Sequence, residues 1–362
     1  MNLRFFIIVI LILDSISLKS QKYANEFLFL GAGARAFGMG NSVITSVLDA
    51  TAGYWNPSNL NLLKNDINLS LMHNSYFGGI SNYNFASVAI KPKDSLAICF
   101  SFLRFAVDDI PNTLELIDQN GNIDYSKIKS FSISDNCLII SLAKEFLYPF
   151  KLGMNTKIIK RIVGSFADAT GFGFDIAFSY FFEKFTFSIV LRDATSTFTY
   201  WTYNYNEFES VFIKTQNKIP SEGWEITYPR LSYGFSYKYI LKQKFNLIVE
   251  TNFDLTTDGK RNTLIATKLF SLDPKIGLEL SYLDVLFLRI GSYNFQKVFN
   301  DKLEKVFNFQ PTIGLGLKFK NIEIDYAYTD IANTSIALYS HVISINFSLA
   351  SSRLNNLLYF KN

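Results

Sequence analysis

Residues 31–36 have the spacing of a phosphate-binding turn, and they follow an apolar run at residues 27–30. Gly31, Gly33 and Ala36 spell G-x-G-x-x-A, the fingerprint with which a dinucleotide-binding domain brings its backbone N–H groups against a pyrophosphate. Asp49 follows at a distance along the chain that would suit a ribose contact. Taken alone, these residues would indicate an enzyme that uses a nicotinamide or flavin cofactor.

The sequence around the fingerprint does not support that chemistry. A phosphate-binding turn needs a helix directly after it, yet Gly38, Gly40 and Asn41 follow, and residues of these types interrupt helices. A basic start, an apolar core at residues 5–13 and a polar stretch to residue 20 predict a secretory signal peptide over residues 1–20. Because soluble NAD stays in the cytoplasm, an exported chain is a poor candidate for binding it. We therefore predict a structural role for the glycines.

Composition excludes several classes of protein. The chain of 362 residues has 36 Phe and 20 Tyr but only two His and two Cys. Two cysteines cannot build a disulfide-rich scaffold or a zinc ribbon, and a net charge of +4 without a basic cluster does not fit nucleic-acid binding. Cys99 and Cys137 could pair after export or stay as free buried thiols. No Ser-His-Asp set or pair of catalytic carboxylates stands out, so we predict no enzyme, no metal site and no cofactor.

The elements that would position these residues are β-strands, because apolar and polar residues alternate strictly beyond residue 65. Apolar side chains occupy every second position of residues 275–282, 312–319, 322–329 and 343–349, with polar, small or charged residues between them. A soluble β-sandwich and a membrane barrel both alternate in this way. Long strands, aromatic residues near strand ends and connectors that alternate between short and long favour the barrel.

We therefore predict an all-β fold: a transmembrane antiparallel β-barrel of about 14 strands over residues 66–349, in the outer membrane and in contact with its lipid. Residues 350–362 form a C-terminal tail. Short turns at the periplasmic end are predicted at residues 78–79, 92–93, 148–149, 183–184, 284 and 320–321. Long outer loops are predicted at residues 108–129, 195–228 and 294–309, with a further insert at residues 256–273.

Residues 21–65 do not alternate and are rich in glycine, which predicts a compact hatch that fills the barrel lumen. The hatch motif comprises Gly31, Gly33, Arg35, Gly38, Gly40, Asp49, Asn56 and Pro57. A buried Arg35 would need carboxylate partners on the lumen face of the wall. We expect the charged residues of the lumen to form one network, which would be either a structural filler or an ion path. These residues are Glu250, Lys275, Glu279, Arg289, Lys318, Glu323 and Asp325.

An aromatic segment within the outer loop of residues 195–228 is a further candidate site. Tyr200, Trp201, Tyr203 and Tyr205 lie close together in the sequence. They would form either an aromatic girdle at the base of the loop or a protein-contact surface, since Tyr and Trp anchor interfaces.

Residues 31–40, Asp49 and the stretch Tyr54-Trp55-Asn56-Pro57 resemble the opening signature of the PorV/PorQ family. Residues 22–28 and the closing hairpin at residues 325–349 are similar to that family too, whereas the tail beyond the last strand departs from it. Members are outer-membrane proteins of Bacteroidetes and relatives, and they belong to the wider FadL-like barrels.

The resemblance implies a non-enzymatic accessory protein of type IX secretion, one that shuttles or attaches exported proteins. Its partners would be secretion-system proteins or exported cargo. The alternative is a FadL-like channel for hydrophobic small molecules. Such a channel needs an apolar cavity beneath the outer loops, and the polar, charged lumen faces favour the accessory protein.

Overall fold

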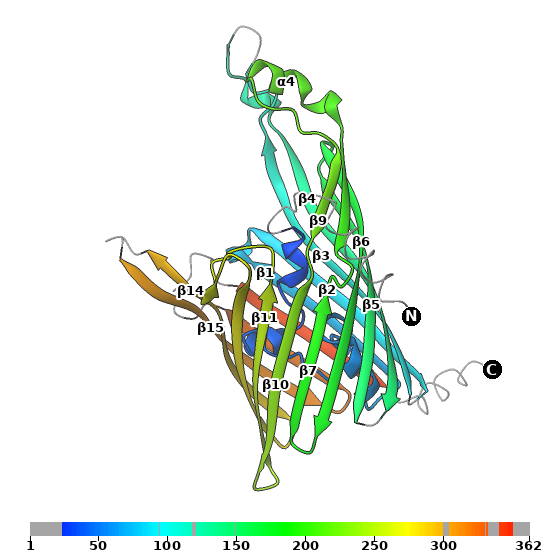
Figure 1. Ribbon diagram of the computed structural model, residues 1–362. Coiled ribbons are helices and arrows are strands. Elements are labelled where there is room, and N and C mark those ends of the chain that lie inside the picture. Colours follow the sequence, from blue (N-terminus) through cyan, green and yellow to red (C-terminus); the bar gives the residue numbers. More distant parts are fainter. Residues whose placement is uncertain are drawn as a thin grey trace, which may run out of the picture.

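The alternating segments bury one face each by closing into a barrel, as seen in a computed structural model (Figure 1). The structure describes residues 24–93, 95–117, 121–147, 149–299, 304–329, 331 and 340–349; the predicted signal peptide and tail lie outside them. The strands are β1 (Ile67–Tyr76), β2 (Ser81–Lys93), β3 (Leu96–Asn112), β4 (Lys129–Leu147), β5 (Phe150–Val163), β6 (Ala167–Phe182), β7 (Phe185–Arg192), β8 (Thr197–Tyr203), β9 (Gly223–Thr227), β10 (Arg230–Leu241), β11 (Phe245–Thr256), β12 (Ile265–Ala266), β13 (Ser271–Tyr282), β14 (Leu286–Phe299), β15 (Lys305–Phe319), β16 (Ile322–Thr329) and β17 (Ser340–Leu349).

The wall is antiparallel throughout and closes because β1 pairs with both β2 and β17. Two of its strands consist of two segments. β6 pairs with β7 along one half and with β8 along the other, while β10 pairs with β7 and β9 pairs with β8. With β7–β8 and β9–β10 each taken as one strand, and the two-residue β12 set aside, the barrel has fourteen strands, which confirms the predicted fold class.

The two ends of the barrel differ. At the hatch end, where β1 begins and β17 ends, tight turns connect the strands, for example at residues 183–184 and 320–321. The opposite end, here the loop end, carries the longer connectors. The turn at Gly78–Gly79, predicted among the short periplasmic turns, lies at the loop end. β1 starts at the hatch end, so the turn that follows β1 lies at the opposite end of the barrel.

Several segments expected as outer loops are strands that continue past the apolar band. β3 runs to Asn112, β14 reaches Phe299, and residues 197–203 and 223–227 form β8 and β9. Beyond the band both faces of a strand are polar or mixed, so alternation fades although the hydrogen-bonded ladder continues. β3, β8 and β9 belong to one side of the wall that rises into an extension carrying α4 (Glu209–Lys214) and η5 (Tyr205–Glu207), whereas β14 projects elsewhere on the rim (Figure 1).

Residues 24–63 lie inside the barrel, where they form η1 (Glu26–Phe29), α2 (Ala34–Gly38), α3 (Ala52–Trp55) and η2 (Pro57–Leu62) (Figure 1). α2 contacts β14 to β17, and η2 contacts β3 to β6 on the other side of the lumen. Phe37, Met39 and Leu60 are fully buried between hatch and wall. Two further one-turn helices, η3 (Phe77–Gly79) and η4 (Tyr125–Lys127), lie in connectors. Among the described residues, no helix has both the length and the apolar character needed to cross a membrane.

The apolar positions of the wall face outward, in the direction that the alternation predicts. On β15, Leu315 is 56% exposed, whereas Thr312 is buried against the hatch. Changing Leu315 to Arg should reduce the stability of the barrel by roughly 2–4 kcal/mol, because a cation would face hydrocarbon. The matched control is Phe319→Arg, also outward but at the strand end, where the cost is about 0–1 kcal/mol. The folded fraction on gels of unheated samples measures both; equal losses would contradict the assigned depth.

From alternation alone, Thr312→Arg should be milder than Leu315→Arg, because Thr312 faces the polar lumen, but the contacts of Thr312 indicate otherwise. The Thr312 hydroxyl donates to the carbonyl oxygen of Gly38 and accepts from the N–H of Gly40, both at 3.1 Å. The lumen is filled at this position, so an arginine there would displace the hatch.

Candidate functional site

The glycines of the hatch allow its backbone to lie directly against the wall. A Cβ on Gly291 of the wall would be 2.2 Å from the backbone nitrogen of Gly40, and one on Gly38 would be 2.9 Å from the Cα of Gly314. Gly40 also has a φ of +59°, a backbone conformation that residues other than glycine rarely adopt. Backbone therefore packs on backbone along β13, β14 and β15.

The N–H groups that a phosphate would need are engaged by protein atoms. The N–H of Gly31 donates to the Tyr54 hydroxyl at 3.0 Å, and that of Gly33 donates to the sulfur of Met72 at 3.0 Å. The N–H of Ala34 donates to the hydroxyl of Ser344 at 2.6 Å. The five-residue α2 that follows is fixed to the wall, so this turn serves as a joint between hatch and barrel.

Asn56 and Pro57 make the turn from α3 into η2. The Asn56 side chain accepts from the N–H of Ser58 at 3.1 Å and donates to the carbonyl oxygen of Ile44 at 2.7 Å. The guanidinium of Arg192, on β7, donates to the last carbonyl oxygens of α3, those of Tyr54 and Trp55, at 3.1 Å each. A cation at a helix C-terminus is favourable, so the wall caps this hatch helix.

A buried ion network joins three wall strands around Arg289, which is 1% exposed. Its guanidinium lies 2.6 Å from Glu279, 2.5 Å from Asp325 and 3.3 Å from Glu323. Because a buried charge is stable only when it is paired, these contacts hold β13, β14 and β16 in one arrangement.

The network extends to the hatch and to the hatch end. Arg35 joins it through Glu279, 2.8 Å from the Arg35 Nε, and this contact raises the pKa of the Arg35 guanidinium above its usual value even though burial opposes the charge. Lys318 joins through Glu323 at 3.2 Å. The cations Arg35, Arg289 and Lys318 thus balance the carboxylates of Glu279, Glu323 and Asp325.

Two residues expected in this network lie elsewhere. Glu250 is fully buried and accepts from the N–H of Thr45 in the hatch at 2.8 Å, without an ion-pair partner among the described residues. Lys275 pairs with Asp254 on the neighbouring strand at 2.6 Å. The lumen face of each strand was predicted from alternation, but which side chains meet across strands depends on the register, which the sequence does not state.

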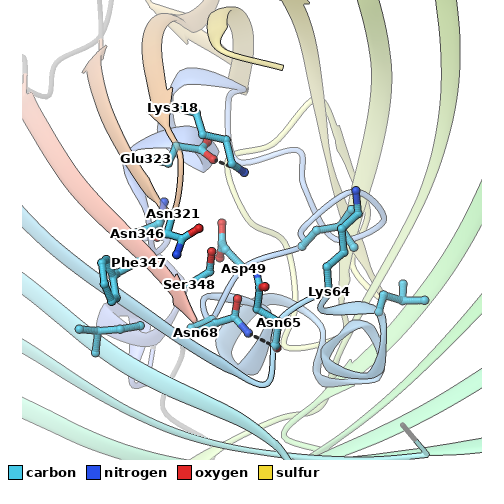
Figure 2. A pocket seen from close by; sticks show the side chains of 14 residues that line it. Asp49, Lys64, Asn65, Asn68, Lys318, Asn321, Glu323, Asn346, Phe347 and Ser348 are labelled. Atoms are coloured by element: carbon cyan, nitrogen blue, oxygen red, sulfur yellow. Dashed lines mark hydrogen bonds and ion pairs between the residues drawn. The ribbon is translucent and has the colours of Figure 1, made fainter. Parts of the chain in front are cut away.

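Asp49 lines a polar cavity of about 190 Å³ at the hatch end (Figure 2). Its carboxylate accepts from the N–H of Thr51 at 2.7 Å, and burial raises the pKa of the Asp49 carboxyl. Lys64, Lys318 and Glu323 also face this space, together with several asparagines (Figure 2). The lining of this cavity thus combines charges of both signs with apolar side chains such as Leu62 and Leu69.

A second cavity, of about 420 Å³, lies in the loop-end extension and has the opposite character. Its lining is almost entirely apolar and comes from the far ends of β3, β4, β5, β6 and β8 and from the η5–α4 segment. It is called the apolar pocket below. The lining residues are Pro111, Asn112, Thr113, Leu114, Phe131, Val163, Phe166, Ala167, Trp201, Tyr203, Phe208, Phe212 and Pro220.

The predicted contact segment is divided by the two faces of β8. Trp201 and Tyr203 line the apolar pocket. Tyr200 is on the other face, 5.0 Å from Trp224 between ring centroids, and its hydroxyl donates to Glu222 at 3.1 Å. Tyr205 packs beside Tyr203, with 6.3 Å between their ring centroids. Residues 200–203 of the segment are therefore strand, with one pocket face and one outer face, and Tyr205 begins η5.

The fold matches solved structures along nearly its whole length. The CymD monoaromatic hydrocarbon channel has a TM-score of 0.56 and 12% identity, covering 88% of this chain and 98% of its own. The toluene transporter TodX of Pseudomonas putida has a TM-score of 0.54 and 12% identity, covering 87% and 96%. A FadL homologue of Pseudomonas aeruginosa has a TM-score of 0.51 and 10% identity, covering 87% and 97%.

The fold is that of FadL-type outer-membrane barrels. No protein-family model matches the sequence. No curated protein matches it either. At these identities the likeness concerns the fold alone, and the solved neighbours named above are described as a channel, a transporter and a FadL homologue.

The structure also shows charged groups that the sequence reasoning missed. Lys157 on β5 lies 2.7 Å from Asp175 and also pairs with Asp193, at the break between β7 and β8. Arg161 pairs with Asp135 at 2.7 Å. The period of two over residues 151–182 places Lys157 and Asp175 on the lumen face, so the same signal that identified the C-terminal charges could have found these.

Cys99 and Cys137 are both buried and unpaired. Within the described chain, no three His, Cys, Asp or Glu side chains converge as a metal site would require.

Proposed function

We propose that this chain is a non-enzymatic outer-membrane channel protein that takes up small, uncharged hydrophobic molecules. The observation that carries the proposal is the apolar pocket at the loop end, which would face the outside of the cell. The descriptions of the fold neighbours, a monoaromatic hydrocarbon channel and a toluene transporter, support this ligand class.

The chemistry of the pocket supports a neutral aromatic or aliphatic ligand. Phe166, Phe208 and Phe212 supply apolar surface, and Trp201 and Tyr203 supply ring faces. Burying apolar area contributes about 25 cal/mol per Å² to affinity, whereas an ionised ligand would lose its hydration without gaining a partner. A charged or sugar-like molecule would therefore bind poorly here.

The lumen below the pocket is closed by the hatch and by the ion network around Arg289. Uptake through the lumen would therefore require the hatch to move. The binding step and the transfer step are separate in this proposal, and they can be tested separately.

Binding can be tested by the quenching of tryptophan fluorescence with bromobenzene, using the protein in lipid nanodiscs. Phe212→Asp places a carboxylate in the apolar pocket and should weaken binding at least tenfold, about 1.4 kcal/mol. The matched control is Ile213→Asp, because Ile213 is the next residue of α4, is 62% exposed and does not line the pocket. If both variants bind bromobenzene as the unaltered protein does, the pocket is not the binding site.

A second candidate function is that of an accessory barrel of type IX secretion, as in the PorV/PorQ family. It is supported by the signature at residues 31–57, by the filled polar lumen and by the exposed rings of Trp224 and Tyr125 on the loop-end extension. Purification from native outer membranes separates the two candidates. Co-purifying secretion components or exported cargo would favour the accessory protein, whereas a retained hydrophobic molecule would favour the channel.

A further inference from the structure

A row of polar side chains crosses the outward face of five neighbouring strands. Cross-strand register aligns His73 on β1 with Asn84, Arg104, Asn136 and Lys160 on β2 to β5. The next row towards the hatch end is apolar, with Leu71, Ala86, Phe102, Leu138 and Ile158. Since polar groups facing hydrocarbon are costly, the step from one row to the other marks the membrane boundary near the loop end.

The charges in this row are not balanced equally. Lys160 is paired with the carboxylate of Asp168. Arg104 has no ion-pair partner within the part of the chain described, and its guanidinium donates to the side-chain Oδ1 of Asn136 at 3.4 Å. His73 and Asn84 bond to each other through Nδ1 and Oδ1 at 2.7 Å. An exposed guanidinium with its donors available therefore stands at the boundary.

A groove of about 380 Å³ lies directly beneath this part of the row, on the outer surface. It exists because Ala86 is a small residue between two large ones, with Leu71 opposite it on β1 and Phe102 opposite it on β3. Ile343 and Ile345 of β17 complete the far side. The lining is almost wholly apolar, except at the upper edge, where His73 and Asn84 stand.

We infer that this surface binds one membrane lipid with an anionic phosphate headgroup, in the leaflet at the loop end and independently of the apolar pocket. The phosphate contacts Arg104, whose planar fork of N–H groups matches phosphate oxygens. Asn84 and His73 flank the headgroup, and one acyl chain lies in the groove over Ala86. Charge complementarity selects an anionic headgroup, and the position of the groove directly below the cation selects a lipid over free phosphate.

Native mass spectrometry of the full-length mature protein tests this site. The protein is released from detergent with phosphatidic acid or with phosphatidylcholine of the same chains, over a concentration series. We expect one phosphatidic acid to be retained, at least tenfold more strongly than phosphatidylcholine. Arg104→Gln should remove most of that preference, and Ala86→Phe should reduce retention by filling the groove without changing any charge.

Lys160→Gln is the matched control, because Lys160 lies in the same row but is already paired. It should leave retention of phosphatidic acid unchanged. All three substituted positions face outward, and the mobility of unheated samples on gels reports whether each barrel is folded. Equal retention by the unaltered protein, Arg104→Gln and Ala86→Phe would overturn the inference, as would equal loss in Arg104→Gln and Lys160→Gln.

Discussion

Planar bilayers that contain the Gly291→Val variant should carry fluctuating ion currents, whereas the unaltered protein should be nearly silent. The reason is steric: even a single Cβ at Gly291 would lie 2.2 Å from the backbone nitrogen of Gly40. Both the wall and the hatch present backbone at this contact, so neither has a side chain that could rotate away. The hatch would have to move away from β14, which would open the lumen. The bore of a barrel widens with strand number, so an open lumen of fourteen strands should conduct ions.

The matched control for this experiment is Gly223→Val. Gly223 is a strand glycine of β9 at which an added Cβ meets no atom within 4 Å. Its replacement should leave the bilayers silent. A large, steady conductance from the unaltered protein would show that the hatch does not close the lumen, and the steric argument would then fail.

Changing Arg289 to Met should destabilise the folded barrel by about 3–5 kcal/mol, the cost of breaking a buried ion pair. The change leaves three carboxylates facing two cations, and Asp325, which is fully buried, loses its ion-pair partner within the described network. Urea-induced unfolding of the protein in detergent, followed by tryptophan fluorescence, measures the loss.

Lys318→Met is the control in the same network. The Lys318 side chain is 42% exposed and, among the described residues, pairs only with Glu323, so its removal should cost no more than about 1 kcal/mol. A similar loss of stability in both variants would mean that burial does not decide the strength of these pairs.

The fold could be predicted because its signal is local. Apolar side chains recur at every second position within each strand, and the number of such alternating segments gives the number of wall strands. The same locality explains what could not be predicted. Whether Lys275 meets Glu250 or Asp254, which are both on β11, depends on how β11 and β13 align across the long connector between them, and no short stretch of sequence specifies that alignment.

The hatch shows the same division between local and non-local information. The glycines at residues 31–40 indicate that the hatch backbone approaches other parts of the protein closely. They do not indicate which wall residues the hatch contacts. Alternation marks Gly277 and Gly314 only as small residues on the polar face of their strands, although an added Cβ at either of them, or at Gly291, would meet hatch backbone. The apolar pocket was missed because its lining comes from five different strands and a helix, each contributing one or two residues.

The position of the hatch directly before β1 also constrains the order of events during assembly. Ile67 at the start of β1 pairs with Leu349 at the end of β17, so the ring closes between the two ends of the described barrel. Contacts between such distant parts of a chain form late, because the loop between them must first be ordered. We therefore expect the hatch to settle against β13 to β15 before the seam between β1 and β17 forms. Closure of the seam would then enclose the hatch, and the last pair of strands to meet would also fix the contents of the lumen.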